Sequence, residues 1–444
     1  MEIVYPRCAG LDVHKKTVVA CRVAPRGKQR HREVRSFGTT VRELLALQDW
    51  LHEWGITHVA MESTGEYWRP IYNVLEGHFE LLLVNAQHVK QVPGRKTDVK
   101  DAEWLADLLR HGLLKASYVP EKEQRELRDL TRYRIKLVQQ RAQVVNRLQK
   151  VLEGTGIKLS SVVSSIVGVS GRAMLDALIA GETDSARLAE LARGRLKSKQ
   201  GALEAALEGQ MDDHHRFMLT HELALFDFLS AQIEQMNERI EMQMTAMDAT
   251  TPPEPPAAPD PDAAPHAEHE ENDEPPSLSH AEAVALLDTI PGVDQQVAEI
   301  IVAELGTDMT RFPTARHAAA WAGVAPGHNE SAGKRRSGQS RRGNRWLRAA
   351  LAQAAWAASH TKDTYLAAQF HRLAARRGKK RAIVAVGHSI LVIAYHMLRK
   401  RQPYRELGHD FFDQRKRDTT VRHLIRRLEK LGVEVPDQAP AVVS

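Results

Sequence analysis

The hydrophobic and polar positions of the first 118 residues follow two different periods, which predicts a domain of mixed strands and helices. Short stretches typical of strands occupy 7–13, 17–24, 30–37, 57–61 and 79–85. Apolar residues recur every three or four positions over 40–54, 68–75 and 101–114, as they do in amphipathic helices. The predicted order is β-β-β-α-β-α-β-α, an α/β domain over residues 1–118.

The rest of the chain is mostly helical in its pattern and divides into four parts. Residues 119–249 combine a long charged helix at 120–158 with a heptad stripe in 217–247, typical of a coiled coil. Residues 250–278 are rich in proline and acids, which predicts a disordered linker. A helical C-terminal domain follows over 279–410, and 411–444 forms a last helix and a tail. No chemistry can be assigned to 159–215.

Composition and charge favour nucleic acid or an anionic surface as a partner. The 444 residues carry a net charge of +6, although 250–276 holds eight acids and no lysine or arginine, so the remainder is clearly basic. Two cysteines make a disulfide framework unexpected and favour a reducing compartment. A signal peptide is not expected, nor is a membrane span, because His388 and His396 interrupt the longest apolar run, 382–398.

Four acids stand at the ends of predicted elements of the α/β domain. Asp12 is on the first strand, Glu62 ends the strand at 57–61, and Asp98 and Asp101 open the helix at 101–114. Separately, these acids fit a turn or helix caps. Together, acids from two strands and a flanking helix can converge on one sheet edge, which is how paired magnesium ions are held for phosphoryl transfer.

A second dense stretch lies at 311–348, where glycine and serine alternate with basic residues. Glycine lets the backbone approach a phosphate while guanidinium groups hold its oxygens, so we favour nucleic-acid contact over a solvated basic loop. The predicted contacts are Lys334, Arg335, Arg336, Arg341, Arg342, Asn344, Arg345 and Arg348.

Two other features leave alternatives open. The arginines and lysines of 120–158 fit a solvated face and phosphate contact equally well. Residues 281–305 read as helix–turn–helix around 290–293, and such a turn can offer N–H groups to a phosphate. The residue after Val293 is Asp294, whose carboxylate would repel a phosphate, so we favour a structural role for the turn.

The motifs GLDVHK, MESTG and KTDVKDA, together with WAGVAPGHNESAGKRRSG-x-SRRGNRWLR, resemble those of insertion sequence 110 family transposases. The resemblance implies an N-terminal RNase H/RuvC-like domain, a central helical coiled coil and a helical C-terminal transposase domain. It implies that Asp12, Glu62, Asp98 and Asp101 bind Mg²⁺ (or Mn²⁺). It also implies that Ser331, which follows Glu330, is the nucleophile.

The same resemblance implies a recombinase of a mobile element, acting in the cytoplasm on the nucleoid of a prokaryote without a membrane partner. Its partners would be double-stranded DNA, as element ends and target, and a non-coding bridge RNA encoded by the element. We expect a homo-oligomer, a dimer or tetramer, formed through the coiled coil, because strand exchange joins two DNA ends. The alternatives are a RuvC-like Mg²⁺-dependent endonuclease of DNA junctions and a non-catalytic nucleic-acid scaffold.

Overall fold

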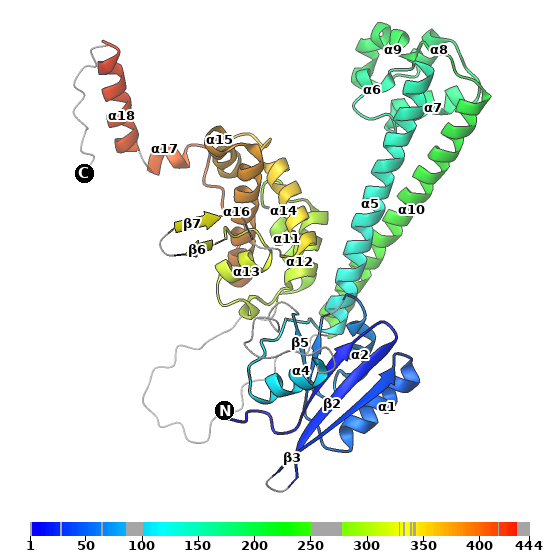
Figure 1. Cartoon of the computed structure of the whole chain (residues 1–444). Coiled ribbons are helices and arrows are strands. Elements are labelled where there is room, and N and C mark those ends of the chain that lie inside the picture. Colours follow the sequence, from blue (N-terminus) through cyan, green and yellow to red (C-terminus); the bar gives the residue numbers. More distant parts are fainter. Residues whose placement is uncertain are drawn as a thin grey trace. The chain divides into compact units, whose positions relative to one another are not determined.

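The computed structural model describes residues 2–26, 29–63, 65–85, 101–250, 278–327, 329–331, 334–337, 340, 343–415 and 417–432. At 26, 250, 329–331, 334–337, 413 and 418–420 it describes the backbone alone. Asp98, Arg341, Arg342 and nearly all of the predicted linker lie outside the described residues. The chain divides into two compact units, Met1–Glu121 and Lys122–Ser444 (Figure 1).

The first unit is built on one five-stranded sheet, and the order of its described elements agrees with the sequence prediction. The elements are β1 (Cys8–Val13), β2 (Thr17–Arg26), β3 (Gln29–Gly38), α1 (Val41–His52), β4 (His58–Glu62), α2 (Trp68–Leu75), β5 (Glu80–Val84) and α4 (Asp101–Arg110). The strand order is β3-β2-β1-β4-β5. The first three strands are antiparallel neighbours, whereas β4 and β5 run parallel to β1.

Helices cover both faces of this sheet. Leu11, Val59 and Met61 pack on one face with the buried residues of α1 and α2. On the other face, Cys8 and Cys21 pack against Ala102, Ala106 and Leu109 of α4. Burial raises the pKa of each of these two thiols to about 12, so both cysteines are protonated apolar core residues at neutral pH.

Two long helices of the second unit run side by side and form an arm over residues 122–250 (Figure 1). They are α5 (Lys122–Thr155) and α10 (Asp213–Thr250). Between them in sequence come α6 (Leu159–Val162), α7 (Val169–Ile179), α8 (Ser185–Glu190), η1 (Gly194–Lys199) and α9 (Gln200–Leu207). Buried leucines, valines and isoleucines of this segment share one core with the two long helices.

The heptad stripe of α10 is covered within the chain, which corrects our assignment of its partner to another subunit. Leu229 and Ile233 are buried in the same core as Leu137 and Val144 of α5, and Ile240 is buried in the core that contains Leu127. The helix α5 repeats Leu130, Leu137, Val144 and Val151 every seven residues, so it offers a matching stripe without the entropy cost of association.

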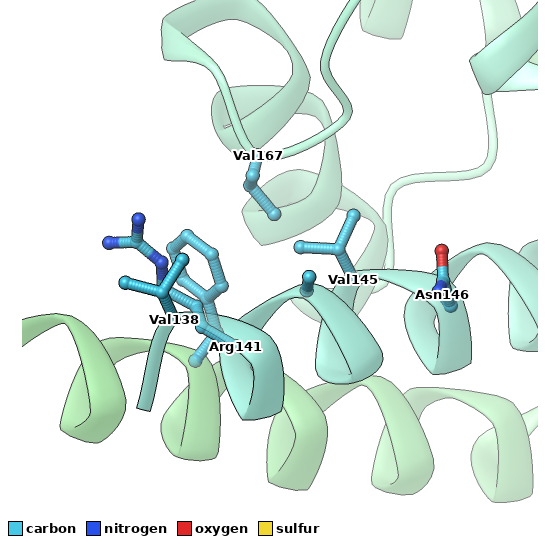
Figure 2. A pocket seen from close by; sticks show the side chains of 7 residues that line it. Val138, Arg141, Val145, Asn146 and Val167 are labelled. Carbon is cyan, nitrogen blue, oxygen red and sulfur yellow. The ribbon is translucent and has the colours of Figure 1, made fainter. Parts of the chain in front are cut away.

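The arm also carries an open recess of about 450 Å³, shown in Figure 2. Its lining is mostly apolar and consists of Val138, Arg141, Ala142, Val145, Asn146, Val167 and Phe226. The guanidinium carbon of Arg141 lies 5.8 Å from the centre of the Phe226 ring. None of these residues belongs to the predicted catalytic or nucleic-acid-binding set.

The C-terminal part of the second unit is a helical domain with a two-stranded ribbon. Its elements are α11 (His280–Asp288), α12 (Gln295–Leu305), η2 (Met309–Arg311), α13 (Ala315–Trp321), β6 (Asn329–Ser331), β7 (Lys334–Ser337), α14 (Arg345–Ala358), α15 (Tyr365–Arg377), α16 (Lys379–Lys400), α17 (Phe411–Arg415) and α18 (Arg417–Lys430). Among the described helices, α16 alone is long and apolar enough to cross a membrane, but it packs against α11, α13, α14 and α15 as a core helix.

The turn between α11 and α12 has a structural role, in line with the reading we favoured. Gly292 has a φ of +87°, and a Cβ atom there would lie 2.4 Å from the carbonyl oxygen of Ala354. The turn therefore sits directly on the backbone of α14. The carboxylate of Asp294 accepts a hydrogen bond from the N–H of Val297 at 2.8 Å and caps α12.

Candidate active site

The register of the sheet places Asp12 and Glu62 on the same face. Strands β1 and β4 are parallel, with Leu11 opposite Met61, and Asp12 and Glu62 are the next residues along each strand. Leu11 and Met61 belong to the core that α1 and α2 cover. Because side chains alternate along a strand, Asp12 and Glu62 project to the opposite face, which α4 covers.

Helix α4 lies directly on β1 and brings Asp101 to the same end of the sheet. A Cβ atom on Gly10 would lie 2.3 Å from the carbonyl oxygen of Ala102, so only glycine allows this approach. Near the other end of β1, the Cys8 Sγ is 3.6 Å from the carbonyl oxygen of Ala106. The helix thus runs opposite to β1, and Asp101, its first residue, lies toward Asp12.

Replacing Gly10 with alanine is expected to lower the free energy of unfolding by about 1–3 kcal/mol, because the added methyl group overlaps the backbone of α4. Urea unfolding followed by circular dichroism would measure the change. The matched control is Gly154→Ala in α5, where nothing lies within 4 Å of the new Cβ atom and the higher helix propensity of alanine stabilises. Equal effects of the two variants would contradict the packing argument.

The structure therefore brings three of the four predicted acids to one end of one sheet face, and all three are partly buried. The carboxylate of Asp12 accepts a hydrogen bond from His14 Nε2 at 3.0 Å. Among the described residues, no three Asp, Glu, His or Cys side chains are close enough to form a metal site by themselves. Carboxylate oxygens are the donors that Mg²⁺ prefers, so these residue types fit such an ion.

The predicted nucleophile is at the tip of the ribbon formed by β6 and β7. Ser331 is the last residue of β6 and pairs with Lys334, while Glu330 pairs with Arg335. The ribbon thus places the backbone of Ser331 opposite Lys334, on the strand that also contains Arg335 and Arg336. Two further predicted contacts, Arg345 and Arg348, are exposed in the first turn of α14.

Asn344, one of the predicted nucleic-acid contacts, makes hydrogen bonds within the protein. Its side-chain oxygen accepts hydrogen bonds from the N–H groups of Trp346 (3.0 Å) and Leu347 (3.1 Å) and caps α14. Its amide nitrogen donates to Glu304 at 2.6 Å. These bonds use the side-chain oxygen and one N–H of the amide, so Asn344 fixes the end of the loop that follows the ribbon.

A buried ionic network, absent from the sequence prediction, holds this end of the loop. Glu304 of α12 is fully buried, and its carboxylate accepts two hydrogen bonds from Arg132, at 2.7 and 2.8 Å. Arg128 Nε lies 3.5 Å from the same carboxylate. The signal in the sequence was the presence of two acids, Glu299 and Glu304, inside the apolar run 297–305, because buried acids require paired cations.

The basic residues of α5 were predicted either to face solvent or to contact phosphates, and several of them form ion pairs within the protein instead. Besides Arg128 and Arg132, Arg134 is buried against Glu299, and Arg147 donates to Glu222 at 2.8 Å. Arg128, Arg132 and Arg134 join α5 to α12, and Arg147 joins the two long helices of the arm, so these four guanidinium groups are engaged within the protein.

Two family models match this chain. One, described as a transposase and modelling the DEDD domain of IS110 elements, matches residues 9–157. The other, described as a transposase of the IS116/IS110/IS902 family, matches residues 284–372. The chain belongs to the IS110 family of transposases. The first match contains all four predicted acids, and the second contains Ser331 and every predicted basic contact.

Two pilin gene-inverting proteins are also similar to this IS110-family chain. The protein from Moraxella bovis is 31% identical over 140 residues, which are 30% of this chain and 42% of that protein. The protein from Moraxella lacunata is 31% identical over 131 residues, which are 28% and 40%. The matched regions span less than half of each relative. The DEDD domain of the IS110 family implies dependence on a divalent metal ion.

Proposed function

We propose that this IS110-family protein is a DNA recombinase that excises and inserts an insertion sequence by strand exchange through a serine nucleophile. The observation that carries the proposal is the placement of Asp12, Glu62 and Asp101 at one end of one sheet face, in a chain of this family. The strand order and the parallel pairing of β1, β4 and β5 support an RNase H/RuvC-like domain.

The four carboxylates, including Asp98, would hold Mg²⁺ (or Mn²⁺), which polarises phosphate oxygens and lowers the pKa of a bound hydroxyl group. The hydrogen bond from His14 would orient the carboxylate of Asp12. Partial burial of the three described acids limits competition from water.

In the proposed cleavage step, the Oγ atom of Ser331 attacks the phosphorus of a DNA phosphodiester. A new O–P bond forms while the bond from phosphorus to the sugar oxygen breaks. The serine proton leaves to a base, and the departing sugar oxygen gains a proton and becomes a hydroxyl group. Attack by a hydroxyl group of another strand reverses the step, which frees Ser331 and joins the new ends.

The basic residues on and after the ribbon would bind the DNA backbone and stabilise the charge of the reacting phosphate. They are Lys334, Arg335, Arg336, Arg341, Arg342, Arg345 and Arg348. The proposed reaction uses the acids of the first unit and Ser331 of the second, and we propose that the protein acts as a dimer or tetramer. The family resemblance further supports a structured RNA, encoded by the element, that pairs with target and donor DNA in the prokaryotic cytoplasm.

The proposal is tested on protein purified from cells that carry the gene with its native flanking DNA. Proteolysis followed by mass spectrometry should find a peptide that contains Ser331 and bears a nucleotide. Exchange of DNA by the same preparation without any serine adduct would overturn the covalent mechanism and favour a hydrolytic nuclease.

A further inference from the structure

One part of the C-terminal domain has many cations and no acids. Residues 364–405 contain ten lysines and arginines without a single aspartate or glutamate. Six of these cations gather where α15 ends and α16 begins, and all six are exposed. This basic corner consists of Arg372, Arg376, Arg377, Lys379, Lys380 and Arg381.

A single residue, Gly378, connects the two helices of the basic corner. Its φ of +83° is in the left-handed region that favours glycine, and its N–H donates to the carbonyl oxygen of Ala374 at 2.9 Å. The inward faces of both helices are fixed in the core, for example by Phe370 and Val386. The backbone of the basic corner is therefore fixed by the core, and its cationic side chains are exposed to solvent.

The charges of the basic corner are not neutralised by the described part of the protein. Arg372 lies over the ring of Phe412 at 5.2 Å, and none of the other five has an ion-pair partner among the described residues. Lys379, Lys380 and Arg381 occupy the first turn of α16, where the helix dipole disfavours cations. This contrasts with Arg132 and Arg134, which are paired with buried acids. Such an arrangement is costly to the isolated protein and favourable once an anion binds.

We infer that the basic corner binds the phosphate backbone of duplex DNA, outside the ribbon that carries Ser331. The inference rests on the proposed function, which supplies duplex DNA as the substrate. Arg376, Arg377 and the three cations of α16 lie beyond residue 372, where the second family match ends. Residues 372–381 include no aromatic side chain on which unpaired bases could stack, so the corner fits a duplex backbone and contacts it without reading sequence.

The test compares two triple variants of the full-length protein with the same loss of charge. One is Lys379→Gln/Lys380→Gln/Arg381→Gln in the corner. The control is Arg195→Gln/Lys197→Gln/Lys199→Gln in the exposed turn η1 of the arm. Binding to a 30-base-pair duplex of random sequence is measured by fluorescence anisotropy between about 50 and 300 mM salt, beside a hairpin RNA as second probe.

The corner variant is expected to bind the duplex roughly tenfold or more weakly at 0.1 M salt. The slope of the logarithm of the association constant against the logarithm of the salt concentration is negative. It should become less negative by about 2.7, since each of three lost phosphate contacts contributes about 0.9. The control should keep the wild-type slope. A wild-type slope in the corner variant, equal losses in both variants, or a loss confined to the RNA would each overturn the inference while leaving the proposed function intact. A wild-type protein that does not bind the duplex would overturn the proposed function itself.

Discussion

Replacing Ser331 with alanine is expected to lower DNA strand cleavage by at least about a thousandfold, because the proposed reaction loses its attacking oxygen. Asp101→Asn should cause a loss of similar size, since it removes a carboxylate charge from the proposed metal site. Cleavage of a labelled duplex by both variants, measured on denaturing gels beside duplex binding, would separate chemistry from affinity. Binding is expected to stay within a few fold of wild type.

Ser337→Ala is the matched control, because Ser337 is on the partner strand of the same ribbon, opposite Asn329. It should cleave DNA at close to the wild-type rate. Normal cleavage by Ser331→Ala together with loss by Asp101→Asn would exclude the serine nucleophile and favour hydrolysis by water. Normal cleavage by both variants would exclude this catalytic centre.

The fold of the first unit follows from sequence because its signals are local. Period-two and period-3.6 patterns mark each strand and helix, and acids at their ends mark the end of the sheet where Asp12 and Glu62 meet. The close approach of α4 was a less visible signal. It depends on Gly10, because a side chain at that position would overlap the backbone of α4. The sequence alone does not show that the helix crosses β1 at this residue.

Pairings between distant segments were harder to predict. The apolar stripe of α10 indicates that the helix packs against another apolar surface. The same heptad pattern fits a helix of its own chain and a helix of another subunit. Asn344 illustrates the same limit within the site. It stands among Arg341, Arg342 and Arg345 in the sequence, whereas its hydrogen-bond partner Glu304 is 40 residues away.

Removal of the Glu304 carboxylate is expected to destabilise the second unit strongly. Glu304→Ala leaves the guanidinium group of Arg132 and the amide of Asn344 without their acceptor in a buried setting. The loss of one partner from a buried ion pair costs about 3–5 kcal/mol. Urea unfolding, followed by the helical circular dichroism signal, would measure the decrease in the free energy of unfolding.

An exposed ion pair of similar geometry in the same unit supplies the control. Asp227 accepts two hydrogen bonds from Arg172, at 2.6 and 2.9 Å, but its side chain is 52% exposed, whereas that of Glu304 is 0% exposed. Asp227→Ala should cost less than about 1 kcal/mol, because water replaces the lost partner. A small and equal cost for both variants would contradict a buried network at the base of the Ser331 loop. A large cost for Glu304→Ala alone would establish that α5, α12 and the cap of α14 are held together by this single carboxylate.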